Sequence, residues 1–155
     1  MDKQPNSRSC FLCGRENPVS LKVSWYNDPD ARRVRATVVV PDDYNSYPGI
    51  VHGGVVAALL DETAGRAVMI DGDWANLMVT LKLEVTYRRA TPTGTPLEVA
   101  GWVLRDGPRR ARVAGEIRLP DGTVTASCEA VVVRPPAEVL AGWETERPHW
   151  RVYDD

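Results

Sequence analysis

Residues 52–70 read HGGVVAALLDETAGRAVMI, and this stretch decides the fold. It is the only long segment of the sequence that favours a helix, because it is rich in Ala, Leu and Met and contains no proline. The pair Asp71-Gly72 follows it and is typical of a helix stop. Apolar residues fall on several sides of the expected helix, which predicts that most of it is buried.

The segments on both sides of this helix have the alternation that is typical of strands. Two strands are expected before it, over residues 19–26 and 33–40, and four after it, over residues 76–87, 97–105, 111–119 and 123–133. This order predicts an α+β fold in which an antiparallel six-stranded sheet wraps around one long central helix. Such a sheet leaves an outer face or edge uncovered, which favours a homodimer or a dimer of dimers.

Composition bounds the domain organisation and excludes several classes of function. The 155 residues suit one domain, which we place at residues 10–134, between a flexible tail (1–9) and a C-terminal extension (135–155). A formal net charge of −2 gives no electrostatic argument for nucleic acid or an anionic membrane surface. No apolar run is long enough to cross a bilayer, and residues 1–9 hold no signal-peptide core, so we expect a cytoplasmic protein.

Asp61 is the candidate catalytic residue. Asp is a poor residue for a helix interior, and the positions three and four residues away are all small: Ala57, Ala58, Ala64 and Gly65. The carboxylate therefore stands in a shallow groove that a ligand or another backbone can approach. Carboxylates in apolar sites are often raised in pKa, and such groups are enriched at active sites. The alternative interpretation is an exposed Asp61 beside Glu62, with the alanines packed on the sheet.

The start of the helix is the second candidate feature. His52-Gly53-Gly54 offers backbone N–H groups at the positive end of a helix, with no side chain on two successive residues. Such donors can polarise a carbonyl or hold an oxyanion. Two glycines equally suit a tight turn into a helix, and His52 alone could simply orient the loop.

The spacing of these two features predicts a dimeric site. Gly53 and Asp61 are eight residues apart, or about 12 Å along one helix. One carbonyl cannot touch both, because each contact requires about 3 Å. If both act on one substrate, the N–H comes from a second, antiparallel helix in another copy of the chain. We therefore expect two active sites at a two-fold interface.

Three stretches resemble hotdog-fold acyl-CoA thioesterases of the phenylacetate-pathway (PaaI-like) type. They read YPGIVHGGVVAALLDETAG at 47–65, CFLCGRENPVSL at 10–21 and TLKLEVTYRRATP at 80–92. The similarity spans residues 10–133, and residues 48–61 are its specific part. The resemblance implies hydrolysis of an acyl-CoA to a free acid and CoA, with no cofactor.

The resemblance also implies roles for individual residues. Asp61 acts as general base or as nucleophile, the Gly53 N–H binds the thioester oxygen, and His52 positions the thioester region. Thr80 stands where some relatives carry a hydroxyl that positions the attacking water. Gly65 stands where some relatives carry Ser or Thr, which leaves Thr80 as the clear hydroxyl candidate.

Further residues are candidates for binding the substrate. Relatives carry Asn or Gln in the loop before the motif, and here Asn45 or Ser46 takes that place. Gly54 leaves the helix start open to the substrate. Phosphates of CoA need cations at the rim, for which Arg88 and Arg89 are candidates, as are Arg109, Arg110 and Arg112. For any single arginine, a solvated charge on an edge strand is the favoured interpretation.

Cys10 and Cys13 form a CxxC pair, but we expect no metal. Zinc requires four ligands, and the sequence offers only Cys128, His52 and His149 besides this pair. A packed turn is the simpler interpretation. With three cysteines, a disulfide framework is not expected either.

Two other functions fit the same fold. One is a non-hydrolytic module that binds acyl-CoA or an acyl-carrier protein. The other is a dehydratase acting on hydroxyacyl or enoyl thioesters, which usually needs a differently placed His–acid pair. The only histidine besides His52 is His149, in the C-terminal extension, so the thioesterase is the function that we predict.

Overall fold

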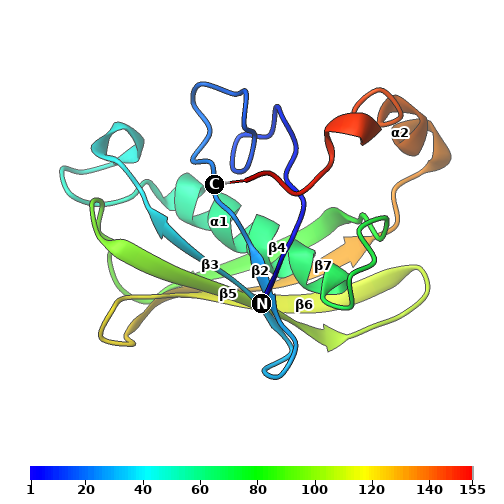
Figure 1. The fold of residues 1–155 in the computed structure, drawn as a ribbon. Helices are drawn as coiled ribbons and strands as arrows, with labels where there is room; N and C mark the ends of the chain where they lie inside the picture. The colour runs from blue at the N-terminus through cyan, green and yellow to red at the C-terminus, as the bar shows by residue number, and fades with distance from the viewer. Residues whose placement is uncertain (155) are drawn as a thin grey trace.

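A seven-stranded antiparallel sheet wraps around one long helix (Figure 1). The computed structural model describes residues 1–154, and the strand order across the sheet is β1-β2-β3-β5-β6-β7-β4. The strands are β1 (Asp2–Lys3), β2 (Tyr26–Asp28), β3 (Arg33–Val39), β4 (Val79–Tyr87), β5 (Pro96–Arg105), β6 (Arg110–Arg118) and β7 (Val124–Val133). The long helix α1 (Gly53–Arg66) continues into the 3-10 turn η2 (Ala67–Met69), and the shorter elements are η1 (Asp42–Tyr44), α2 (Ala137–Gly142) and η3 (Arg147–His149).

Helix α1 lies at the centre of the core. Leu59 and Leu60 are fully buried in one cluster with side chains from β5 and β6, such as Val99 and Val113. Burying a side chain of this size contributes about 1.5–3 kcal/mol, so the apolar helix is held by the sheet around it. The predicted α+β hotdog architecture is confirmed. The sheet has seven strands rather than six, because the short β1 pairs with β2.

The prediction of a strand over residues 19–26 is wrong, although the alternation correctly indicated which side chains are buried. Val23 and Trp25 are buried, as the alternation predicted. However, Lys22 has a positive φ of 53°, which interrupts an extended run. The carbonyl of Trp25 accepts a hydrogen bond from the Gln4 N–H outside any ladder. Within residues 19–26, only Tyr26, the first residue of β2, is therefore part of a paired strand.

Residues 1–9, expected to form a flexible tail, lie against the body of the protein. Gln4 and Asn6 are fully buried. The Asn6 Nδ2 donates to the carbonyl oxygens of Val23 and Cys13, at 2.9 and 3.2 Å. The Asn6 backbone pairs with Arg151, so the first and last segments run side by side over α1 (Figure 1). The domain boundaries at residues 10 and 135 stay predictions.

Gly101 on β5 sets how closely α1 approaches the sheet. A Cβ at this position would lie 2.5 Å from the Thr63 carbonyl oxygen, which is backbone and cannot move away. We expect Gly101→Ala to lower the free energy of unfolding by about 1–3 kcal/mol, because overpacking forces the helix off the sheet. Thermal and urea unfolding measure this change.

The control is Gly65→Ala in α1, where a Cβ meets nothing within 4 Å. That substitution should stabilise the helix by about 0.5–1 kcal/mol. Equal effects of the two substitutions would contradict the proposed close approach.

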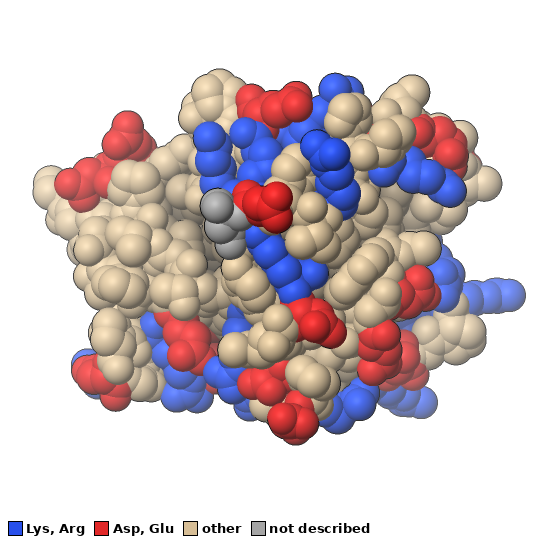
Figure 2. Space-filling model, viewed as in Figure 1, with Lys and Arg blue, Asp and Glu red and all other residues tan. Residues whose placement is uncertain are grey.

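Surface charge is mixed rather than segregated. In the view of Figure 2, Lys and Arg are interspersed with Asp and Glu. Many of these charges are paired, for example Arg35 with Asp28 and Glu98. None of the helices described in residues 1–154 combines the length and apolar character that a membrane span requires.

Candidate active site

His52 caps α1 and leaves one backbone donor free. Its Nδ1 accepts a hydrogen bond from the Gly54 N–H at 2.9 Å. The Gly53 N–H donates no hydrogen bond within residues 1–154. Gly53, and not Gly54, therefore presents a free donor at the positive end of the helix.

Gly53 and Gly54 differ in how much room there is for a side chain at each position. A Cβ on Gly54 would lie 3.1 Å from the His52 Nδ1, so only glycine lets the imidazole fold over the helix start without displacement. A Cβ on Gly53 would meet the Tyr87 hydroxyl at 3.5 Å, an ordinary contact. The Tyr87 hydroxyl donates to the Gly53 carbonyl at 2.6 Å, which ties the end of β4 to the first turn of α1. Sequence reasoning missed this residue, since Tyr87 reads simply as the last member of an alternating strand.

Asp61 lies two turns further along α1 and is half-buried. Thr80, near the start of β4, donates a hydrogen bond from Oγ1 to the Asp61 Oδ1 at 2.6 Å. Burial raises the pKa of Asp61, the Thr80 hydrogen bond opposes this rise, and the negative charge of Glu62 adds to it. A carboxylate with a raised pKa is a stronger proton acceptor near neutral pH. The structure thus brings together the candidate base and the candidate hydroxyl.

The surroundings of Asp61 are open on one side. Ala64 is fully buried in the core, whereas Ala57, Ala58 and Gly65 are partly exposed. Since a Cβ on Gly65 would meet nothing within 4 Å, the space beside the carboxylate is unfilled. A ligand can therefore reach Asp61 from this side.

Asp61 and Thr80 are among the residues that line a cavity of about 1040 Å³. Its walls come from α1, from the segment between Met69 and Thr80, from N-terminal residues between 7 and 13, from Val132 on β7 and from the C-terminal residues between 140 and 150. The apolar members of the lining include Met69, Trp74, Met78, Leu140, Trp143 and Trp150. A largely apolar cavity with a carboxylate in its lining is the kind of site that binds a small ligand with an apolar group.

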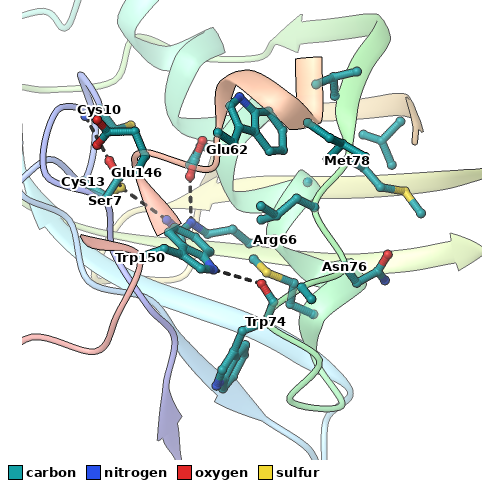
Figure 3. Close-up of a pocket in the computed structure, with 18 of the residues that line it drawn as sticks. Ser7, Cys10, Cys13, Glu62, Arg66, Trp74, Asn76, Met78, Glu146 and Trp150 are labelled. Carbon is teal, nitrogen blue, oxygen red and sulfur yellow. Dashed lines mark hydrogen bonds and ion pairs between the residues drawn. The ribbon is translucent and has the colours of Figure 1, made fainter. Parts of the chain in front are cut away.

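Arg66 is buried beside this cavity and fully engaged (Figure 3). Its guanidinium donates to Glu62 at 2.8 Å and to the Cys13 Sγ at 3.3 Å. It also lies over the ring of Trp25, 4.2 Å from the centroid. No sequence pattern signals this residue, because all of its partners except Glu62 are distant in the chain.

The cysteine pair does not fit a metal ion. Sulfur atoms of Cys10 and Cys13 and a carboxylate oxygen of Glu62 lie within 4.8 Å of one another, which is the right donor set for a cation. The guanidinium of Arg66 already supplies the positive charge there, bonded to both Cys13 and Glu62. The hydrogen bond with Cys10 lowers the pKa of Cys13. A further cation beside Arg66 would be repelled, and tetrahedral zinc would still lack a fourth ligand.

The remaining candidates lie at the surface, away from the Asp61–Thr80 pair. Asn45 and Ser46 are exposed in the loop before α1, where Asn45 forms a β-bridge with Val51. Arg88 and Arg89 are exposed directly after β4. In the described part of the chain, none of these side chains contacts Asp61 or Thr80 by a hydrogen bond or ion pair.

Strand β4 is an edge strand with exposed apolar side chains. It ends the strand order and pairs with β7 on one side only. Leu81 and Tyr87 are 65% and 54% exposed. An unpaired apolar edge of this kind is a surface that another chain can cover.

Thr80→Val tests the coupling between Thr80 and Asp61. If ionised Asp61 is the base, catalysis falls as pH drops through its pKa. Removing the hydrogen bond that holds this pKa down should move the acidic limb of kcat/KM to higher pH and reduce the rate below it. Measuring kcat/KM from acid to neutral pH with an acyl-CoA checks this prediction.

Thr86→Val is the matched control, because Thr86 is an exposed threonine of the same strand. Its pH profile should equal that of the wild type. An unmoved acidic limb in Thr80→Val would show that Thr80 does not act through Asp61.

Comparison with known proteins places the chain in a family. The sequence model described as the thioesterase superfamily matches residues 48–126, about half of the chain, which include α1 and most of the sheet. A curated protein of Saccharolobus solfataricus, named as a candidate esterase, is 31% identical over 94 residues, which are 59% of this chain and 66% of that protein.

Solved structures share the fold. A thioesterase superfamily protein has 35% identity and a TM-score of 0.73, over 81% of this chain and 63% of that one. The PaaI protein of the E. coli phenylacetic acid degradation operon has 19% identity and a TM-score of 0.60, over 66% of this chain and 76% of that one. A protein of Streptococcus mutans bound to acetyl CoA has 24% identity and a TM-score of 0.59, over 65% of this chain and 79% of that one. The chain thus spans slightly less than two thirds of the esterase and of the first of these structures.

Proposed function

Because the chain belongs to the thioesterase superfamily, we propose that it hydrolyses the thioester of an acyl-CoA to a free acid and CoA. The observation that carries this proposal is the hydrogen-bonded pair of Asp61 and Thr80 in the lining of a largely apolar cavity, where burial raises the pKa of the carboxyl. The acetyl CoA bound to the Streptococcus mutans protein supports CoA as the carrier of the acyl group.

The proposed reaction uses few groups, because a thioester is already activated. The Gly53 N–H donates to the thioester carbonyl oxygen and stabilises the negative charge that develops on it. Asp61 accepts a proton from water as the water oxygen attacks the carbonyl carbon. The tetrahedral intermediate then expels the thiolate of CoA, which takes the proton back from Asp61. In the second possible course, Asp61 attacks the carbonyl carbon itself, the C–S bond breaks with release of the CoA thiolate, and water hydrolyses the resulting anhydride.

The site is proposed to form between two copies of the chain. Gly53 and Asp61 lie on one straight helix, about 12 Å apart, so one copy cannot place both against one carbonyl. Pairing of the β4 edges across a two-fold axis would cover Leu81 and Tyr87 and set two α1 helices antiparallel. Each dimer would then hold two sites, and a dimer of dimers is compatible with the same contact.

Residues at the rim are proposed to bind the CoA part. Asn45, Ser46 and His52 precede the N-terminal end of α1 in the chain, and Gly54 makes room there for the imidazole of His52. Arg88 and Arg89 are exposed and suit phosphate groups.

Release of CoA, followed with a thiol reagent over a panel of acyl-CoAs, tests the proposed function. We expect turnover of at least one acyl class and loss of that turnover in Asp61→Asn. Binding of acyl-CoA by calorimetry without any release would instead identify a non-hydrolytic binding module. Release that does not depend on Asp61 would refute the assignment of the base.

A further inference from the structure

The end of the C-terminal segment, residues 146–151, is fixed by three contacts to other parts of the chain. Arg8 and Glu146 form a two-pronged ion pair, with N–O distances of 3.0 and 2.8 Å. The Trp150 Nε1 donates to the Trp74 carbonyl at 2.9 Å. Since Arg151 also pairs with Asn6, the segment is held against both the N-terminal segment and the loop before β4.

This segment gives the cavity its apolar outer wall. Leu140, Trp143 and Trp150 line the cavity from the C-terminal segment. Trp74 and Met78 line it from the loop before β4 (Figure 3). Leu140 is 43% exposed, so its apolar surface remains unfilled in the structure. Its neighbour in α2, Val139, is exposed to a similar extent but does not line the cavity.

The size and chemistry of the cavity indicate what fills it. At about 1040 Å³ it lies at the upper end of pockets that enclose small-molecule ligands, roughly 300–1,000 Å³. An acetyl group would leave most of this space to water. The nearest buried charge, Arg66, is already bonded to Glu62 and Cys13 and offers no free partner for a charged acyl group.

We propose that residues 137–150 form the specificity-determining wall of the acyl site and select acyl-CoAs with a long apolar acyl chain over short ones. This inference rests on the proposed function, because it takes Asp61 as the point at which the thioester sits. Leu140 and Trp143 are the specificity-determining residues of the wall. They contact the chain of the substrate and take no part in the reaction.

Steady-state kinetics with acetyl-, butanoyl-, octanoyl- and dodecanoyl-CoA test the proposal. Each buried methylene should raise kcat/KM about fourfold until the chain reaches the wall. Leu140→Ala and Trp143→Ala should each lower kcat/KM for dodecanoyl-CoA about tenfold and leave acetyl-CoA within about twofold, because only the long chain reaches them. Val139→Ala, the matched control from the same helix, should change neither value.

The possible outcomes distinguish failure of the proposed wall from failure of the proposed thioesterase activity. Two results would overturn the proposed wall but leave the proposed thioesterase activity intact. One is Asp61-dependent hydrolysis whose kcat/KM does not vary with chain length. The other is a chain-length dependence that Leu140→Ala and Trp143→Ala leave unchanged. If no acyl-CoA is hydrolysed, the thioesterase fails, and calorimetric titration with dodecanoate and butanoate tests the wall by itself. Tighter binding of dodecanoate that Trp143→Ala weakens and Val139→Ala does not would support it, and equal binding of both acids would overturn it.

Discussion

Asp61→Asn is expected to lower kcat for acyl-CoA hydrolysis by about 10²–10⁴-fold, the usual contribution of a general base. The amide cannot accept the proton of the attacking water, nor can it attack the thioester. Its Oδ1 still accepts the hydrogen bond from Thr80, so the local geometry is preserved. Burial of Asp61 raises its pKa, which means that the neutral amide does not remove a stabilising charge. CoA release and thermal unfolding, measured on the same preparation, check both parts.

The control for this variant is Asp71→Asn, which changes an exposed carboxylate just beyond the helix. It should keep the wild-type rate. A rate within a few-fold of wild type for Asp61→Asn would remove Asp61 from the reaction, whatever the fold shows.

Gly53→Pro is expected to lower kcat by about 10²–10³-fold, the usual effect of losing one oxyanion donor. Gly53 is the first residue of α1, where the N–H has no partner in the helix and proline is well tolerated. The preceding residue, His52, has a ψ of 134°, which a following proline favours. The substitution thus removes the proposed donor and leaves the helix able to form.

Gly53→Ala is the matched control, because it adds a Cβ at an ordinary distance from Tyr87 and keeps the N–H. It should retain most of the activity. Similar losses in the two variants would show that crowding, and not the missing donor, is responsible.

Mixing the two inactive variants tests whether the site spans two chains. In a random mixture of Asp61→Asn and Gly53→Pro subunits, half of the dimers combine one of each, and half of the sites in these dimers are intact. About one quarter of the wild-type activity should therefore return. Mixtures that stay inactive after subunit exchange would place both groups of each site on one chain.

The sequence by itself determined the architecture around α1. The composition of residues 52–70 and the alternation of the later segments are local signals, and they predicted the helix and the strands from β3 to β7 with ends that are correct to within a few residues. Asp61 also stood out locally, since an acidic residue among small and apolar ones in a helix is unusual. The prediction of a dimeric site depends only on helix geometry, so it needed nothing beyond the spacing of Gly53 and Asp61.

Only the tertiary structure decided how the two ends of the chain pack. Val23 and Trp25 alternate like a strand, but the Trp25 carbonyl bonds Gln4, a partner that no local pattern could indicate. The outer wall of the cavity likewise comes from residues 140–150, whose sequence has no clear period. Periodicity reports which face of an element is buried, whereas contacts between distant segments depend on packing energies summed over the whole chain. The extent of the core could therefore be predicted from the sequence, whereas the shape of the cavity beside Asp61 could not.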